Sequence, residues 1–146
     1  MDRTVDTEHR VAIALDMHAR GYNCAQAVAC SLAEPAGYDE DACFRMMEAF
    51  GGGMGSHTET CGAISGAVAA VGYGMSSGIA GPISKQGTYA AVSQIPIRFR
   101  RKVGSTVCRE IRQEDENGIA SDSPLRSCDG CIEDAVRMAC ELLARR

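Results

Sequence analysis

The sequence predicts an all-α protein: one compact helical domain over residues 1–146, a bundle of about six or seven helices. Hydrophobic residues make up 45% of the chain, with abundant Ala and no Trp, and such alanine-rich chains favour helices. Apolar residues recur at helical spacing, and no useful stretch alternates apolar and polar residues as a strand does. A chain of this length can bury a core of its own, so a single domain is expected.

Capping residues predict the first helices. The first helix is expected over about residues 4–20 from its apolar stripe. Asn23 is a good N-cap for the second helix, and Gln26, three positions on, completes a variant of the capping box. Pro35 and Gly37 are expected to close that second helix.

The third helix is expected to begin after Asp39 as its N-cap and to stop in the glycine cluster at residues 51–55. A glycine cluster cradles phosphate when a strand precedes it, but here a helix precedes it, which argues against nucleotide binding. We interpret the cluster as a tightly folded turn that lets the backbone approach a sulfur site. The inward stripe of the third helix is predicted to comprise Cys43, Met46, Met47 and Phe50.

The fourth helix is predicted from about Cys61 to Tyr73, and it contains two glycines four residues apart, Gly62 and Gly66. Glycine inside a helix costs up to about 1 kcal/mol relative to alanine. Two such glycines indicate that something packs very close to this helix, either another helix backbone or a cofactor.

The rest of the chain is predicted to alternate loops and helices. Pro96 should break or kink its helix near Gln94, because proline disrupts a helix interior. Tyr89, Val92, Phe99 and Val103 are expected on the face of that helix. The expected elements are a loop over 76–83, a helix over 84–103, a short helix capped by Ser105 or Thr106, a polar stretch over 114–127 and a last helix over 129–143.

Charge and hydropathy limit the function classes. The net charge of −4 argues against nucleic acid as the main partner, and we interpret the one basic run, residues 98–102, as a solvated helix face. The most apolar window, residues 63–75, is about 13 residues long, whereas a membrane-spanning helix needs about 20. The N-terminus lacks the features of a signal peptide. We therefore expect no membrane insertion and a cytoplasmic location, where eight cysteines favour metal or redox roles over structural disulfides.

Four cysteines lie near the predicted starts of four different helices: Cys24, Cys61, Cys108 and Cys131. A helix start presents free N–H groups and a partial positive charge, which favour the reactive thiolate. The three cysteines predicted to lie within helices, Cys30, Cys43 and Cys140, are interpreted as packing residues. Cys128 forms a CxxC pair with Cys131 but lacks a βαβ context, and His57 is the only histidine near the constellation.

These features resemble the redox-active protein family named for a C…CGAxxG…C…C cysteine pattern. The resemblance implies that Cys24, Cys61, Cys108 and Cys131 are the four characteristic cysteines and that Cys128 is an addition. It also implies a bacterial or archaeal source and genes that neighbour transporter genes. The matching stretches are residues 21–28, 50–55, 61–67 and 104–110, followed by Cys131 and an amphipathic helix.

The leading hypothesis is that these four cysteines converge in one site for thiol–disulfide electron transfer, which leaves oxidoreductase activity open. Cys61 would be the most activated thiolate, Cys24 its nearest helper, and Cys108 with Cys131 a second pair. In the alternative, the same four cysteines are metal ligands, holding an iron–sulfur cluster or another thiophilic metal. Gly52, Gly53, Gly62 and Gly66 are the candidate residues for contact with a cofactor or partner.

A third alternative is a non-redox helical partner of a membrane transporter system. The sequence leaves open the substrate, the electron donor, the redox partner, a homo-oligomeric state, and the roles of Cys128 and His57.

Overall fold

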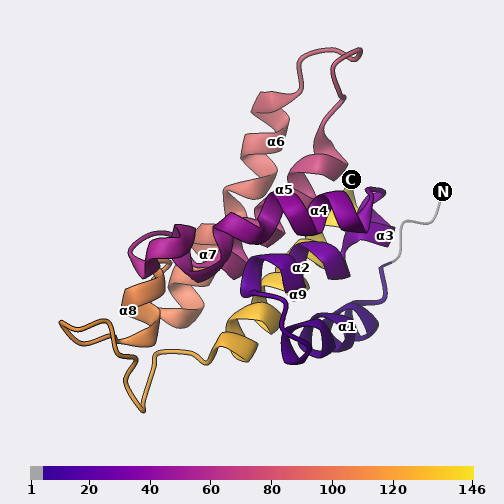
Figure 1. Ribbon diagram of the computed structural model, residues 1–146. Coiled ribbons are helices and arrows are strands. Elements are labelled where there is room, and N and C mark those ends of the chain that lie inside the picture. Colours follow the sequence, from indigo (N-terminus) through magenta and orange to yellow (C-terminus); the bar gives the residue numbers. More distant parts are fainter. Residues whose placement is uncertain (1–4) are drawn as a thin grey trace.

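A computed structural model describes residues 5–146, and this part of the chain is helical and contains no β-strand (Figure 1). The all-α prediction is therefore confirmed. All seven predicted helical segments are present, and two of them are divided. The α-helices are α1 (Thr7–Ala19), α2 (Cys24–Ser31), α3 (Ala33–Ala36), α4 (Glu40–Met47), α5 (Gly62–Met75), α6 (Lys85–Val92), α7 (Gln94–Val103), α8 (Cys108–Arg112) and α9 (Cys128–Arg145). Two short turns, η1 (Glu48–Phe50) and η2 (Gly53–His57), lie between α4 and α5.

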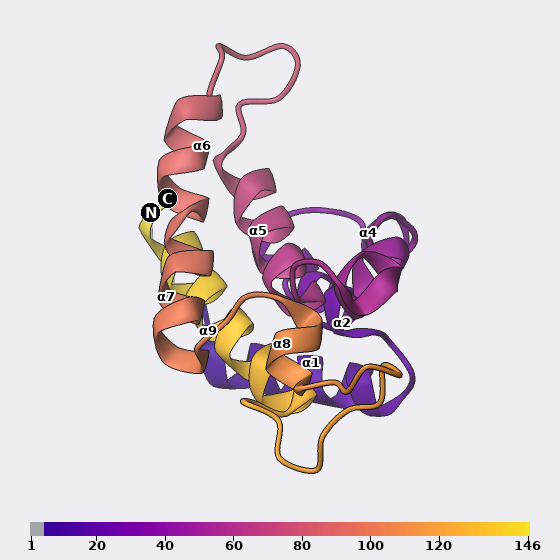
Figure 2. The same cartoon turned by 90° about the vertical axis from the view of Figure 1, so that its left-hand side faces the viewer.

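The apolar helix α5 packs against both α2 and α9, and α1 packs against the same two helices. Helix α4 covers α2, and α7 lies between α5 and α9. In Figure 2 the loop between α5 and α6 extends beyond the rest of the molecule, and α8 lies near the start of α9. None of the helices in residues 5–146 is long and apolar enough to cross a bilayer.

The core is built mainly from small and aliphatic side chains, with Phe99 as its one fully buried ring among residues 5–146. Small residues let α2 approach α5 closely: a Cβ atom on Gly66 would lie 2.7 Å from the backbone oxygen of Ala25. The close neighbour expected for Gly66 is therefore another helix backbone. This contact places the start of α2 beside the start of α5.

Two predicted inward stripes were only partly right. Cys43 and Met47 are buried, but Met46 is 73% exposed and Phe50 is 37% exposed. Helix α4 has only two turns and packs one narrow face on α2, so Met46 has no element to cover it. Tyr89 is likewise 63% exposed, because it lies on α6, which follows the protruding loop.

The capping predictions at the first two sites were correct. The Asn23 side chain accepts the Gln26 N–H at 2.9 Å, and the Gln26 side chain accepts the Asn23 N–H at 3.0 Å. The Asp39 carboxylate accepts the Ala42 N–H at 2.7 Å. The predicted cap of α8 was wrong: Val107 is the N-cap, and the Ser105 hydroxyl instead accepts the Val107 N–H at 3.0 Å.

Both divided helices are interrupted near a proline. The second predicted helix divides at Leu32 into α2 and α3, with Pro35 inside α3 and Gly37 closing it at φ +92°. The helix predicted over 84–103 divides at Ser93, as expected near Gln94, because Pro96 has no N–H to donate and its ring crowds the preceding turn. The start predicted for the first helix, residue 4, lies outside the described residues, and α1 begins at Thr7.

Candidate functional site

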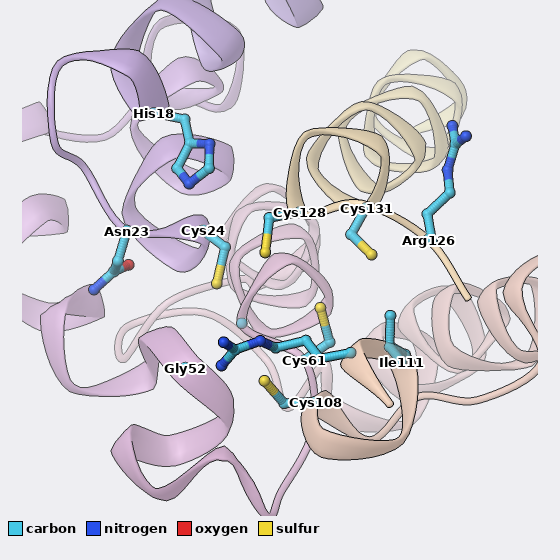
Figure 3. A pocket seen from close by; sticks show the side chains of 12 residues that line it. His18, Asn23, Cys24, Gly52, Cys61, Cys108, Ile111, Arg126, Cys128 and Cys131 are labelled. Carbon is cyan, nitrogen blue, oxygen red and sulfur yellow. The ribbon is translucent and has the colours of Figure 1, made fainter. Parts of the chain in front are cut away.

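Five cysteines line one cavity of about 180 Å³ where the starts of four helices meet (Figure 3). They are the four cysteines expected from the sequence together with Cys128. In Figure 3 Cys24 and Cys128 approach the cavity from one side and Cys61 and Cys108 from the other. The complete lining is His18, Asn23, Cys24, Gly52, Cys61, Gly62, Cys108, Ile111, Arg112, Arg126, Cys128 and Cys131.

Each cysteine is held by a helix start. Cys24, Cys108 and Cys128 are the first residues of α2, α8 and α9, and Cys61 is the N-cap of α5. Cys131 is one turn into α9. The expectation that the four family cysteines mark different helix starts is therefore correct.

Two backbone hydrogen bonds link the segment around Cys61 to the segment around Cys108. The Cys61 N–H donates to the backbone oxygen of Thr106 at 2.8 Å, and the Cys108 N–H donates to that of Glu59 at 2.9 Å. These two bonds lie on either side of an isolated antiparallel β-bridge between Thr60 and Val107. Two extended residues thus fix the starts of α5 and α8 side by side, although almost fifty residues separate them in the sequence.

Among the five cavity cysteines, Cys61 is the one whose pKa is lowered. Its pKa is lowered from an ordinary 9.0 to about 7, chiefly because the Cys131 thiol donates a hydrogen bond to its sulfur. The backbone N–H groups of Ala63 and Ile64, in the first turn of α5, also stabilise the thiolate, while burial opposes both effects. The same contact raises the pKa of Cys131, which holds the shared proton.

The other cavity cysteines favour the protonated thiol. Burial raises the pKa of Cys24, although the Gly52 N–H donates to its sulfur, and burial also raises the pKa of Cys128. The pKa of Cys108 is raised to about 11, mainly by burial, although Arg112 acts in the opposite direction. The helix start is therefore not sufficient by itself: desolvation outweighs it at the other cavity thiols, and at Cys61 the Cys131 thiol is the main cause of the lowered pKa. The hydrogen-bond partner of Cys61 is Cys131, whereas Cys24 was the expected helper.

The four candidate glycines have different neighbours. Gly62 and Gly52 line the cavity, and a Cβ atom on Gly62 would lie 2.5 Å from the Cys24 sulfur. Gly53 lies behind Cys108, where a Cβ atom would be 2.6 Å from the Cys108 Cβ. Gly66 faces α2 and is not part of the lining. The glycine turn thus brings backbone up to the sulfur atoms, as expected.

Arg112 is a site residue that the sequence analysis missed. It lines the cavity and is held from behind by the buried Glu114 carboxylate at 2.9 Å. His57 Nδ1 lies 2.8 Å from that carboxylate and also contacts Arg112, while its ring packs against Gly52. His57 therefore supports the cation and the glycine turn without lining the cavity. The available signal was the spacing of Cys108 and Arg112, which are one helical turn apart, with Arg112 two residues beyond the matched stretch 104–110.

Two other side chains of the lining, Arg126 and His18, are each paired with a carboxylate. Arg126 bonds the buried Asp134 carboxylate at 3.1 Å, and His18 lies 2.7 Å from Asp129. Arg112 also has a carboxylate partner, but it is the cation that lowers the pKa of both Cys108 and Cys128.

The donor set consists of thiols. Among residues 5–146 no group of three or more His, Cys, Asp or Glu side chains has the spacing that would hold a single metal ion. The five thiols instead surround an open volume. The mid-helix cysteines Cys30, Cys43 and Cys140 are buried elsewhere, as expected.

The fold and the cavity define an all-α protein with a multi-cysteine site. The chain belongs to the family described as "Putative redox-active protein (C_GCAxxG_C_C)", whose model matches residues 22–142. The family resemblance inferred from the sequence is thereby confirmed. The family description writes GCAxxG, whereas this chain reads Cys61-Gly62-Ala63 at that point. No curated protein and no solved structure matches this chain.

Proposed function

We propose that this protein carries out thiol–disulfide exchange, with Cys61 as the attacking thiolate and Cys131 as the resolving thiol. The observation that carries the proposal is that Cys61 and Cys131 line the same cavity, where the Cys131 thiol lowers the pKa of Cys61 to about 7. A thiolate is the attacking species in disulfide exchange, and a pKa near the ambient pH gives the fastest attack.

The exchange would proceed in two steps. The Cys61 thiolate attacks one sulfur of a substrate disulfide, forming a mixed disulfide and releasing one substrate thiolate. Cys131 then loses its proton to solvent and attacks the Cys61 sulfur, forming the Cys61–Cys131 disulfide and releasing the second substrate thiolate. Two electrons pass from the cysteine pair to the substrate, and a dithiol donor reverses the reaction to regenerate the pair.

Arg112 would stabilise the anions that this reaction forms. Its guanidinium lines the cavity and lowers the pKa of two neighbouring thiols. A substrate thiolate released into the same cavity would experience the same attraction. Glu114 and His57 would act as positioning residues for Arg112.

Peptide mapping after oxidation tests this pairing. Trypsin releases Cys61 as the single cysteine of residues 46–85 and Cys131 within residues 127–137. We expect brief oxidation with a small disulfide to link these two peptides, and the link to persist in Cys128→Ser but to vanish in Cys131→Ser. A link that requires Cys128, or none at all in the folded protein, would contradict the proposed pair.

A second candidate function, iron–sulfur cluster binding, is favoured by a different observation: five thiols face one small cavity. Thiolates are the ligands that such clusters prefer, and four of them are needed. The donor set therefore fits a cluster better than a single ion. Cys24, Cys61, Cys108 and Cys131 would hold it, with Cys128 beside them, and a bound cluster would supply one-electron transfer.

Anaerobic purification separates the two functions. Visible absorption together with stoichiometric iron and sulfide, lost in Cys61→Ser and retained in Cys140→Ser, would replace the dithiol proposal with the cluster. A colourless, metal-free protein with the Cys61–Cys131 link would support exchange. If the protein is metal-free and the cavity cysteines alkylate no faster than Cys140, the non-redox partner role remains.

A further inference from the structure

A second pair of thiols lies outside the cavity, between α2 and α4. Cys30 and Cys43 were interpreted from the sequence as packing residues. In the structure Cys30 faces the part of α4 that carries Cys43, because α2 packs on α4 and each thiol perturbs the pKa of the other. Both are nearly inaccessible, at 4% and 9% exposure. The sulfur of Cys30 also lies 3.8 Å from the backbone oxygen of Glu40, at the start of α4.

The two thiols differ in access to solvent. Cys43 lines a separate pocket of about 310 Å³, whereas Cys30 is not part of its lining. The pocket is mostly apolar, with the packed rings of Tyr38 and Tyr73 in its wall, 5.1 Å apart. A reagent in this pocket would therefore meet Cys43 first.

The surroundings of Cys43 also favour it as the nucleophile. The neighbouring Cys30 thiol is the main cause that lowers the pKa of Cys43, although burial and Glu40 act against it. The Tyr38 hydroxyl is also close to Cys43, but it donates its hydrogen to the backbone oxygen of Ala29. The pKa of Cys30 is raised by the same contact and by burial. The arrangement repeats that of Cys61 and Cys131, in which one thiol is activated and its neighbour keeps the proton.

We propose that Cys30 and Cys43 form a second redox-active dithiol, which an uncharged small disulfide oxidises through the pocket beside Cys43. The Cys43 thiolate attacks one sulfur of the reagent, forms a mixed disulfide and releases the first thiolate of the reagent. Cys30 then gives its proton to solvent and attacks the Cys43 sulfur, releasing the second. The product is an inter-helix disulfide, and the two electrons reside on the two released thiols.

The chemical class of the reagent follows from the pocket. Its lining is apolar apart from Asp39 and the Tyr hydroxyls, and Glu40 and Asp41 follow at the start of α4. The Asp39 carboxylate in the lining repels anions, and the lining contains no cationic side chain to bind them. An uncharged aromatic or aliphatic disulfide therefore fits, and an anionic disulfide does not.

The test uses the full-length protein and two probes, uncharged 4,4′-dithiodipyridine and the dianionic 5,5′-dithiobis(2-nitrobenzoate). Trypsin with Glu-C cleaves after Arg20, Glu40 and Arg45, which separates Cys30 from Cys43. We expect the uncharged probe to link these two peptides. We also expect Cys43 to react several times faster than the buried Cys140, because the pKa of Cys43 is lowered whereas burial raises that of Cys140. The anionic probe should react more slowly.

Variants assign the two roles. Cys30→Ala should stop at a stable mixed disulfide on Cys43, and Cys43→Ala should leave Cys30 unmodified. Cys140→Ala is the matched control, because Cys140 is equally buried within a helix but contacts no other thiol, and the link should persist in it. Fragmentation of the linked peptide distinguishes Cys30 from Cys24, which lies on the same fragment.

The inference does not rest on the function proposed for the cavity. Cys61→Ala should abolish the Cys61–Cys131 link and leave the Cys30–Cys43 link intact, so each proposal can fail alone. The second dithiol is overturned if Cys43 stays unmodified in the folded wild-type protein. It is also overturned if Cys43 reacts only at the rate of Cys140, or if no Cys30–Cys43 peptide forms.

Discussion

Replacing Cys131 with alanine removes the thiol that donates to Cys61, and it should return the pKa of Cys61 from about 7 towards the ordinary 9.0. Burial would then act without its main opponent, while the N–H groups of Ala63 and Ile64 would still favour the thiolate. The pH dependence of Cys61 alkylation should therefore shift upwards. The reaction rises with pH in both proteins, because the thiolate is the reacting form.

The size of the effect depends on two opposing factors. At pH 7 about half of a thiol with a pKa of about 7 is ionised, against about 1% when the pKa is about 9, a ratio of about 50. A Brønsted slope of about 0.4–0.5 makes the less basic thiolate about eightfold slower, so the wild type keeps an advantage of about sixfold at pH 7. Above both pKa values the order reverses, and the two curves should cross at about pH 8.

The assay is pulsed alkylation with iodoacetamide at a series of pH values, followed by mass spectrometry of the tryptic peptide 46–85, whose single cysteine is Cys61. Cys128→Ala is the matched control, because Cys128 lines the same cavity without donating to Cys61. Circular dichroism verifies that each variant is folded. A wild-type midpoint near 9, or a Cys131→Ala curve that overlies the wild type, would refute the assignment of Cys131 as the donor.

Three further predictions concern the helix contacts and Arg112. Gly66→Ala should lower the free energy of unfolding by about 1–2 kcal/mol, because overpacking outweighs the gain in helix propensity. Gly87→Ala on α6, where a Cβ atom would meet nothing within 4 Å, should raise the free energy of unfolding by up to about 1 kcal/mol. Urea unfolding measures both variants, and equal effects would contradict the close contact at Gly66. Asn23→Ala removes both the cap of α2 and a 2.9 Å bond to the Glu48 carbonyl, so the same measurement should show a loss of about 1–2 kcal/mol. Arg112→Gln should move the alkylation midpoint of Cys108 upwards from about 11, and an unchanged midpoint would show that the guanidinium does not act on this thiol.

Much of the local structure could be predicted from the sequence. The capping box at Asn23 and Gln26, the cap at Asp39 and the break before Pro96 depend on residues within four positions of one another. Such local interactions can be recognised from the amino-acid sequence alone. The wrong cap at Ser105 shows the limit, because the backbone pairing of Cys108 with Glu59 decides where α8 begins.

The candidate site was predicted only in part. The four cysteines of the family pattern do share a cavity, and the glycine turn does bring backbone to it. The sequence offered no means of adding Cys128 and Arg112, or of excluding Gly66 from the lining. These outcomes depend on the directions in which side chains leave their helices once α2, α5, α8 and α9 are packed.

The sequence by itself determined the helical class, most helix boundaries and the placing of cysteines at helix starts, because these follow from propensities and contacts within a few residues. The tertiary structure alone decided which thiols meet: Cys61 with Cys131, and Cys30 with Cys43. It also decided which of them has a lowered pKa. A thiol pKa reflects the balance between desolvation and the hydrogen bonds that reach the sulfur, and both are set by helices brought together from distant parts of the chain.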